Sequence, residues 1–343
     1  MMIVMKETAT EEEIAAVVAR IESVGARAHV SPGELLTVIG AIGGQDPEVR
    51  LADIGLEGAP GVDKVMPIIK PYKLAGLQIN HGEPSVLNIG GRKVGGTNFS
   101  MMAGPCTVES RDQVLTTARV VKECGGSMFR GGAYKPRTSP YSFQGLGVEG
   151  LELLKEAREE TGLPIVTEVM DPRDVEKVIG IADVIQIGAR NMQNYNLLTE
   201  IGKSGIAALL KRGLAATLEE FVMASEYILK EGNPNVMLCE RGIRTFETSY
   251  RFTLDITAVP ILKELTHLPV IIDPSHAAGR RALVEPLSLA AAAVGADGII
   301  VEIHPNPEEA ICDGPQALYT ADFPAYMEKV VQAAAIAGKT LAN

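Results

Sequence analysis

From Thr97 to the C-terminus, short apolar segments alternate regularly with segments of helical periodicity. Eight such strand and helix pairs over about 245 residues are typical of a closed (β/α)8 TIM barrel. A doubly wound open sheet is the alternative, but the regular repeat without a long interruption favours closure. The expected strands are 99–103, 127–131, 164–169, 184–187, 207–211, 236–240, 270–273 and 298–303.

The first 70 residues have a different pattern and indicate a separate unit. Strand-like segments are expected at 3–5, 26–30, 35–42 and 62–68, with a helix that begins after Thr10 and a second helical pattern at 47–54. This βαββαβ order predicts a small ferredoxin-like domain over residues 1–70. A proline-rich linker with a short hairpin is expected over 71–96, and the barrel over 97–343.

Composition and charge limit the partners of the chain. A hydrophobic content of 46% over 343 residues can fill a large core. The net charge of −11 opposes binding to nucleic acid or to an anionic membrane, so any site that binds an anion must be a local patch of positive charge. There is no signal-type N-terminus and no apolar run of about 18 residues. Four scattered cysteines form no disulfide framework, and we therefore expect the cytoplasm.

Cationic side chains are concentrated in the segment 129–145, FRGGAYKPRTSPYSFQG. Three cations fall within eight residues, with glycines and no acidic residue between them. Arginine and lysine suit phosphate and carboxylate groups, and neighbouring cations repel one another unless an anion is bound, so a solvated basic turn is the weaker interpretation. Further cations follow other expected strands, which implies at least two anionic groups of substrate. The set is Arg130, Lys135, Arg137, Arg190, Lys211 and Arg241.

Four potential metal ligands lie at the C-terminal ends of the first, seventh and eighth expected strands or in the loops that follow them: Cys106, His276, Glu302 and Asp313. Alone, each cysteine or histidine is better explained as a core residue. In a closed barrel these strands are neighbours, so the four groups should converge. A thiolate, an imidazole and two carboxylates suit Mn²⁺, Fe²⁺, Co²⁺ or Zn²⁺ better than Mg²⁺ or Ca²⁺. His304 and Cys312 are nearby alternatives.

These residues lie in motifs that, in chain order, resemble those of the 3-deoxy-D-arabino-heptulosonate 7-phosphate (DAHP) synthases. The motifs are AGPCTVES, GGAYKPRTSPYSFQG, QIGARNMQN, LLKRG, LCERGIRTF, DPSH and VEIHP. The resemblance covers the whole barrel, and the subtype with an N-terminal ferredoxin-like regulatory domain accounts for the first 70 residues as well.

The resemblance implies a metal-dependent, aldol-type condensation of phosphoenolpyruvate with D-erythrose 4-phosphate and water, which releases phosphate. This is the first step of the shikimate pathway of aromatic amino acid biosynthesis. The implied ligands of one divalent ion, with Mn²⁺ as first choice, are Cys106, His276, Glu302 and Asp313. The implied contacts to phosphoenolpyruvate are Arg190 and Lys211 at its phosphate, Lys135 and Arg241 at its carboxylate, and Arg130 and Gln186 in the same pocket. Arg137 and Thr138 would bind the phosphate of the aldose.

Three residues are candidates for catalytic roles in this reaction. We expect Lys135, close to both substrates, to donate a proton to the developing alkoxide. Either Glu168 or Asp273 is expected to orient the attacking water.

The resemblance also implies regulation and assembly. Relatives of this subtype bind tyrosine or phenylalanine on the N-terminal domain, which closes over the barrel mouth, and a homotetramer is usual. His29 and Ser31, in HVSPG, match positions of effector contacts, although a plain turn explains this segment equally well.

Two other functions compete with this interpretation. The sister family of 3-deoxy-D-manno-octulosonate 8-phosphate synthases uses arabinose 5-phosphate and usually has KANR followed by serine or threonine. This chain instead has Lys135-Pro136-Arg137-Thr138. A non-catalytic scaffold is the other possibility, but it would need none of the metal-type or cationic residues.

Overall fold

The computed structural model describes residues 1–33, 36–42, 54–66, 72–137 and 139–342. Contacts divide the chain into two compact units, Met1–Pro71 and Tyr72–Asn343. Each unit has its own hydrophobic core. Within the described ranges, no helix combines the length and the apolarity that crossing a membrane requires.

The N-terminal unit is an antiparallel sheet with a helix. Its elements are β1 (Met2–Met5), α1 (Glu11–Ser23), β2 (Arg27–Pro32), β3 (Thr37–Ile42), η1 (Leu56–Gly58) and β4 (Val62–Met66), and the strand order is β2-β3-β1-β4. Helix α1 begins at a capping box between Thr10 and Glu13 and buries Val17 and Ile21. This order confirms the ferredoxin-like prediction. The helix expected at 47–54 lies outside the described residues except for Ile54.

Eight parallel strands form the ring of the second unit. They are β7 (Asn98–Gly104), β8 (Met128–Arg130), β9 (Ile165–Glu168), β10 (Val184–Ile187), β11 (Ala207–Lys211), β12 (Val236–Glu240), β13 (Val270–Ile272) and β14 (Gly298–His304). The ring closes because β14 pairs with β7, from Gly298 opposite Ser100 to Glu302 opposite Gly104. Closure excludes the open sheet and confirms the predicted TIM barrel.

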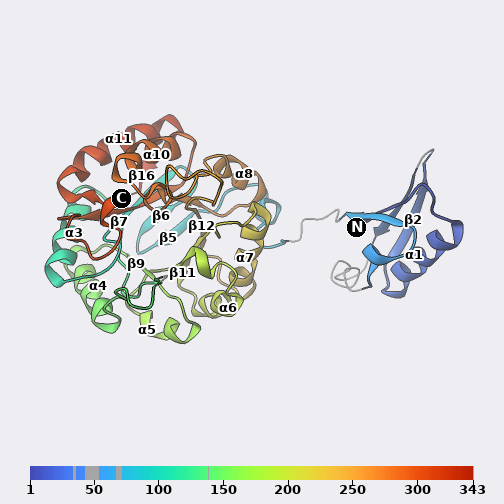
Figure 1. The fold of residues 1–343 in the computed structure, drawn as a ribbon, viewed down its shortest axis with the longest axis horizontal. Coiled ribbons are helices and arrows are strands. Elements are labelled where there is room, and N and C mark those ends of the chain that lie inside the picture. The colour runs from blue at the N-terminus through green and yellow to red at the C-terminus, as the bar shows by residue number, and fades with distance from the viewer. Residues whose placement is uncertain (34–35, 43–53, 67–71, 138, 343) are drawn as a thin grey trace. The chain divides into compact units, whose positions relative to one another are not determined.

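Helices surround the strands, as the end-on view shows (Figure 1). They are α3 (Arg111–Glu123), α4 (Val148–Thr161), α5 (Val175–Val178), α6 (Tyr195–Ser204), α7 (Leu218–Lys230), α8 (Ala258–Leu265), α10 (Arg281–Ala293) and α11 (Phe323–Ile336). Short elements complete the unit: η2 (Leu77–Asn80), β5 (Leu87–Ile89), β6 (Arg92–Val94), η3 (Pro172–Asp174), η4 (Ala189–Asn191), α9 (Pro274–Ala278), η5 (Gly314–Gln316), β15 (Leu318–Tyr319), η6 (Thr320–Asp322) and β16 (Thr340–Leu341).

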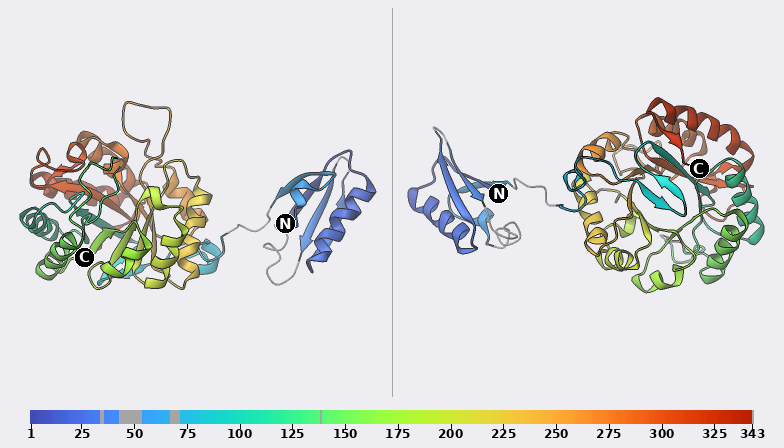
Figure 2. Two further views of the ribbon diagram at one scale, coloured as in Figure 1. Left: turned by 60° about the horizontal axis from the view of Figure 1, so that its bottom comes forward. Right: turned by 180° about the vertical axis from the view of Figure 1, so that it is seen from behind.

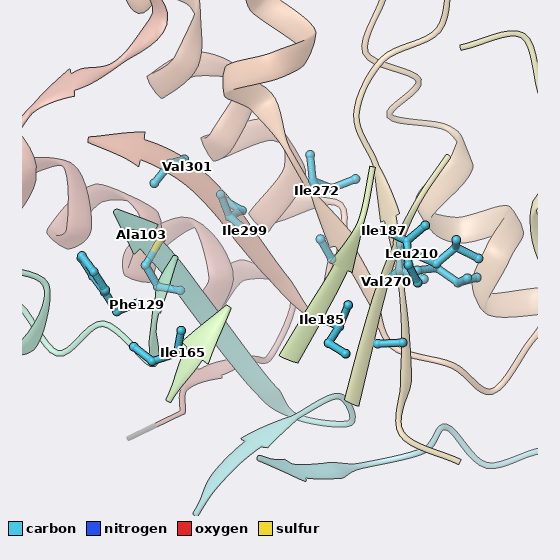
Figure 3. Packing of buried hydrophobic residues seen from close by; sticks show 14 of the residues in the cluster. Ala103, Phe129, Ile165, Ile185, Ile187, Leu210, Val270, Ile272, Ile299 and Val301 are labelled. Carbon is cyan, nitrogen blue, oxygen red and sulfur yellow. The ribbon is translucent and has the colours of Figure 1, made fainter. Parts of the chain in front are cut away.

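Alternate residues of each strand face opposite sides, which gives the barrel two apolar layers. Outward residues such as Phe129 and Ile185 pack with the helices (Figure 3). Inward residues such as Met102 and Leu209 form an inner cluster that also contains Leu87, Ile89 and Val94 of the hairpin β5–β6. Figure 2 shows this hairpin across one end of the ring. Chemistry is therefore confined to the other end, where the strands have their C-termini.

The segment that leads into the barrel is bound to its surface. The amide of Ala75 donates to Glu226 Oε1 at 2.7 Å, and the His267 ring lies between Ser85 Oγ (2.7 Å) and the Leu74 carbonyl oxygen (2.8 Å). Much of the expected linker, from residue 72 onward, is thus packed against α7 and α8. No role for His267 was evident from the sequence, because its partners are distant along the chain.

Candidate active site

The inward-facing residues change from apolar to charged within two residues at the C-terminal ends of the strands. Such pairs are Met128 and Arg130, Val166 and Glu168, Leu209 and Lys211, Ile271 and Asp273, and Ile300 and Glu302. Because side chains alternate along a strand, each second residue of a pair points to the same side as the first, one layer higher. The charged side chains therefore meet in one layer above the apolar interior.

The four potential metal ligands lie together in this layer. One donor atom from each of Cys106, His276, Glu302 and Asp313 can be chosen so that all lie within 4.8 Å of one another. Cys106 Sγ lies 3.0 Å from Asp313 Oδ2, and His276 Nε2 lies 3.2 Å from Glu302 Oε1. Since β14 pairs with both β13 and β7, the elements that carry these residues are neighbours.

The surroundings of His276 suit a metal ligand. Its Nδ1 is 2.7 Å from Asp273 Oδ2, so Nε2 is turned toward Glu302 and Asp313. Burial lowers the pKa of His276 even though Asp273 acts in the opposite direction. A neutral imidazole whose other nitrogen is bonded to a carboxylate is the usual arrangement of metal-binding histidines. The donor set of the cluster therefore fits a divalent cation.

The other members of the cluster also show perturbed ionisation. Burial, the Cys312 thiol and Glu302 raise the pKa of Cys106 well above its usual value. Burial alone would raise the pKa of Asp313, but His276 and Lys135 outweigh it and hold that pKa low. A bound divalent cation would favour the thiolate form of Cys106, in the way that coordination deprotonates thiols.

Asp273 holds two basic side chains in place. It caps α9, where its Oδ1 accepts from the His276 amide at 2.9 Å, while Oδ2 contacts both His276 Nδ1 and Lys211 Nζ. Burial would raise the pKa of Asp273, yet His276 and Lys211 keep it well below its ordinary value. Both oxygens of this carboxylate are thus engaged.

A cavity of about 310 Å³ opens next to the cluster. Predicted site residues in its lining are Lys135, Arg137, Glu168, Gln186, Arg190, Lys211, Arg241, His276 and Asp313. Arg130 is buried next to the ligand cluster, where its Nη1 donates to the Pro105 carbonyl oxygen (2.8 Å) and to Glu302 Oε1 (3.2 Å). Thr138 lies outside the described residues. The cavity brings several cations together in a chain whose net charge is strongly negative, as an anion site requires.

Lys135 and Glu168 differ in how fully their charged groups are paired in this cavity. Lys135 Nζ lies 2.6 Å from Cys106 Sγ. Burial would lower the pKa of Lys135, but Cys106 and Glu302 raise it above its ordinary value, so the ammonium form persists. Glu168 Oε2 accepts from Gln186 Nε2 at 2.9 Å, whereas its buried Oε1 has no hydrogen-bond partner among the described residues. That oxygen can accept from a water or a ligand in the cavity.

Some site residues were not identified from the sequence. Arg251 and Phe252 line the cavity, and the Arg241 guanidinium lies 4.7 Å from the centroid of the Phe252 ring. Gln316 donates through Nε2 to Glu302. Arg251 and Phe252 lie about ten residues beyond the end of strand β12, in a loop whose path the strand order does not determine.

The two alternative ligands occupy different positions. His304 Nε2 lies 3.3 Å from Glu109 Oε2, and its Nδ1 accepts from the Asn306 amide at 3.0 Å. Cys312 Sγ is 3.8 Å from Cys106 Sγ and accepts from Arg137 at 3.2 Å. In the N-terminal unit, His29 and Ser31 are exposed on β2.

Comparison with known proteins identifies the family. Residues 81–337 match the profile described as the DAHP synthetase I family, and residues 1–70 match the DAHP synthase ferredoxin-like domain. This chain belongs to the DAHP synthetase I family. The resemblance found in the sequence is thereby confirmed, together with the predicted enzyme class.

Relatives and solved structures agree with this family. The phospho-2-dehydro-3-deoxyheptonate aldolase of Thermotoga maritima is 50% identical over 330 residues, which are 96% of either chain. The 2-dehydro-3-deoxyphosphooctonate aldolase of Geobacter sulfurreducens is 32% identical over 263 residues, 71% of this chain and 96% of the relative. The crystal structure of DAHP synthase from Thermotoga maritima has a TM-score of 0.93 at 48% identity, covering 99% of this chain and 98% of its own. A truncated form of that enzyme has a TM-score of 0.74 at 46% identity, covering 79% and 99%.

Proposed function

We propose that this chain condenses phosphoenolpyruvate with D-erythrose 4-phosphate and water to give DAHP and inorganic phosphate, with the help of one divalent cation. The observation that carries the proposal is the juxtaposition of the four-residue ligand cluster with a cavity rich in cations. Family membership supports the same reaction.

The cation would be held by Cys106, His276, Glu302 and Asp313. Sulfur and nitrogen donors favour Mn²⁺, Fe²⁺, Co²⁺ or Zn²⁺ over Mg²⁺ and Ca²⁺. Such an ion supplies Lewis acidity toward the aldehyde oxygen of the aldose. The ligand residues would hold it at the floor of the site, beside Lys135.

The cations of the cavity would orient the two substrates. Arg190 and Lys211 would bind the phosphate of phosphoenolpyruvate, and Lys135 and Arg241 its carboxylate. Gln186 lies in the same lining, and Arg130 is buried next to Glu302. Arg137 would bind the phosphate of the aldose, a role that it would share with Thr138. Two phosphates fixed at separate cations bring carbon 3 of phosphoenolpyruvate close to the aldehyde carbon, which lowers the entropic part of the barrier.

Lys135 would transfer a proton, and Glu168 would orient the attacking water. Carbon 3 attacks the aldehyde carbon, and the oxygen that gains negative charge takes a proton from the Lys135 ammonium. Water adds to carbon 2, and one of its two protons restores the Lys135 ammonium. The bond between carbon 2 and the phosphate oxygen then breaks, carbon 2 becomes a carbonyl, and the second proton leaves with the phosphate. Glu168 Oε1 would accept a hydrogen bond from that water, since it is the oxygen without a protein partner. Asp273, whose oxygens are engaged, would instead orient His276 and Lys211.

A phosphate-release assay tests the reaction. The protein is incubated with phosphoenolpyruvate and either erythrose 4-phosphate or arabinose 5-phosphate, with and without a chelator. We expect release with erythrose 4-phosphate, its loss with the chelator and its return with Mn²⁺. Preference for arabinose 5-phosphate would identify an octulosonate 8-phosphate synthase, and absence of release with either aldose would favour a non-catalytic role.

We further propose that tyrosine or phenylalanine inhibits the enzyme by binding to the N-terminal domain, with His29 and Ser31 as contacts, and that the enzyme is a cytoplasmic homotetramer. The match to a ferredoxin-like domain of DAHP synthases supports the regulatory part. A chain that begins at Tyr72 should keep its activity and lose the inhibition. Sedimentation equilibrium tests the tetramer.

A further inference from the structure

Gln316 is a buried residue of η5 that bridges a metal-type ligand and an arginine. It is 2% exposed, its Nε2 donates to Glu302 Oε2, and its Oε1 accepts from Arg251 Nη1 at 3.0 Å. Because one end of the amide faces an acceptor and the other a donor, the orientation of the Gln316 side chain is determined.

The two oxygens of Glu302 therefore have different surroundings. Oε2 is bonded to Gln316, whereas Oε1 faces His276 Nε2 and Arg130 Nη1, each at 3.2 Å. The backbone amide of Glu302 is also fixed, since it donates to Ser275 Oγ at 3.0 Å. Oε1 is therefore the oxygen of Glu302 that contacts another member of the ligand cluster, His276.

The two carboxylate oxygens of Asp313 also have different partners. Its Oδ2 faces Cys106 Sγ at 3.0 Å, and its Oδ1 lies 3.5 Å from Arg251 Nη1. A single nitrogen of Arg251 thus contacts both the Gln316 amide oxygen and Asp313. The residue Asp313 also has a left-handed backbone (φ 55°), a conformation that a residue other than glycine keeps only where its surroundings hold it.

We propose that Gln316 and Arg251 are positioning residues that keep Glu302 and Asp313 as ligands through one oxygen each. This inference rests on the proposed metal site. A carboxylate that binds with both oxygens takes an additional coordination position. Because the second oxygen of each carboxylate would be bonded to Gln316 or Arg251, a coordination position would remain for an oxygen of the substrate. Carboxylates that are hydrogen-bonded in this way also bind metals more tightly.

The test uses the full-length chain loaded with Co²⁺. The visible absorption of Co²⁺ weakens as its coordination number rises, and a thiolate ligand adds a near-ultraviolet charge-transfer band. The variants are Gln316→Leu and Arg251→Met, and the control is Gln332→Leu at an exposed position of α11. We expect either site variant to bind Co²⁺ about 10- to 100-fold more weakly in competition with a chelator, and to show weaker visible bands. The control should match the wild type.

The outcomes separate this inference from the proposed function. If the wild type shows no thiolate charge-transfer band, the proposed metal site itself fails. A wild type with the band, together with site variants of unchanged affinity and spectrum, overturns the positioning role and leaves the metal site intact. If Gln316→Leu does not fold, Arg251→Met tests the positioning role instead. Arg251 is partly exposed, so its replacement is easier to tolerate, and it removes the hydrogen bond that Arg251 donates to Gln316.

Discussion

Replacing Asp273 by asparagine should destabilise the barrel through Lys211. The two side chains form an ion pair in which Lys211 is 4% and Asp273 is 1% exposed. Asparagine keeps the size of the side chain and an oxygen that can cap α9, but it removes the negative charge. Lys211 is then left as a buried cation whose nearest countercharge has been lost.

The expected size of the effect follows from burial. Removing one partner of a buried ion pair costs about 3–5 kcal/mol. Because asparagine can still accept the hydrogen bond from the His276 amide, we take the lower end of that range, about 3 kcal/mol. For a domain of this size, each kcal/mol lowers Tm by about 2–4 °C, so the variant should melt roughly 6–12 °C below the wild type.

Phosphoenolpyruvate should partly reverse this loss if Lys211 faces the substrate phosphate. A ligand at 100 times its Kd stabilises a protein by about 2.7 kcal/mol. In the variant, the phosphate supplies the negative charge that Lys211 lacks, whereas in the wild type Lys211 is already paired. At equal phosphoenolpyruvate concentration, Tm should therefore rise more in the variant than in the wild type.

Differential scanning calorimetry of both proteins, with and without phosphoenolpyruvate, measures the two effects. The control is Asp171→Asn, which breaks a pair with Arg173, an arginine that is 87% exposed, and should change stability by at most about 1 kcal/mol. A variant that melts within 1 °C of the wild type, or that gains no more from phosphoenolpyruvate than the wild type, would refute the reasoning.

Three further predictions concern stability and catalysis. Burial raises the pKa of Tyr326, whereas tyrosine in the unfolded chain ionises near pH 10. Above about pH 10 only the unfolded chain loses this proton, so the free energy of unfolding should fall by up to about 1.4 kcal/mol per pH unit. Tyr326→Phe should remove that slope in urea unfolding between about pH 7 and 11, and Tyr141→Phe, at a side chain that is 96% exposed, should retain it; equal slopes in all three proteins would contradict this. Gly298→Ala places a methyl group 2.4 Å from the Ser100 carbonyl oxygen at the closing strand pair and should cost about 1–3 kcal/mol in urea unfolding. Gly58→Ala, which meets nothing within 4 Å, is its control, and a Gly298→Ala variant as stable as that control would count against the described closure. Glu168→Gln should lower kcat about 100-fold or more with little change in the KM for phosphoenolpyruvate, and an unchanged kcat would remove Glu168 from the proposed mechanism.

The barrel and its ligand cluster were predictable from the sequence for one physical reason. Buried parallel strands are continuous apolar runs, and the residues that follow them gather at one end of the ring. Cys106, His276 and Glu302 are far apart in sequence, but they lie at or just after the C-terminal ends of neighbouring strands. Their proximity required only the order of the strands and closure, without any knowledge of the loops.

Contacts that depend on loop conformation were not predictable. Asp313 was predicted as a ligand, but nothing in the sequence indicates that Asp313 itself adopts a left-handed backbone in the loop after β14. Gln316 and Arg251 meet because two loops, after β14 and β12, approach each other. The positioning role of Asp273 was missed for a similar reason, since it depends on how α9 begins.

The central claim is that ring closure assembles one cation site from Cys106, His276, Glu302 and Asp313. Equilibrium dialysis with Mn²⁺, followed by the phosphate-release assay on the same samples, tests it most directly. We predict one Mn²⁺ per chain, activity in proportion to occupancy, loss of both in His276→Ala, and wild-type behaviour in Cys124→Ser. Full activity without bound metal, or Mn²⁺ binding that His276→Ala leaves unchanged, would contradict the claim.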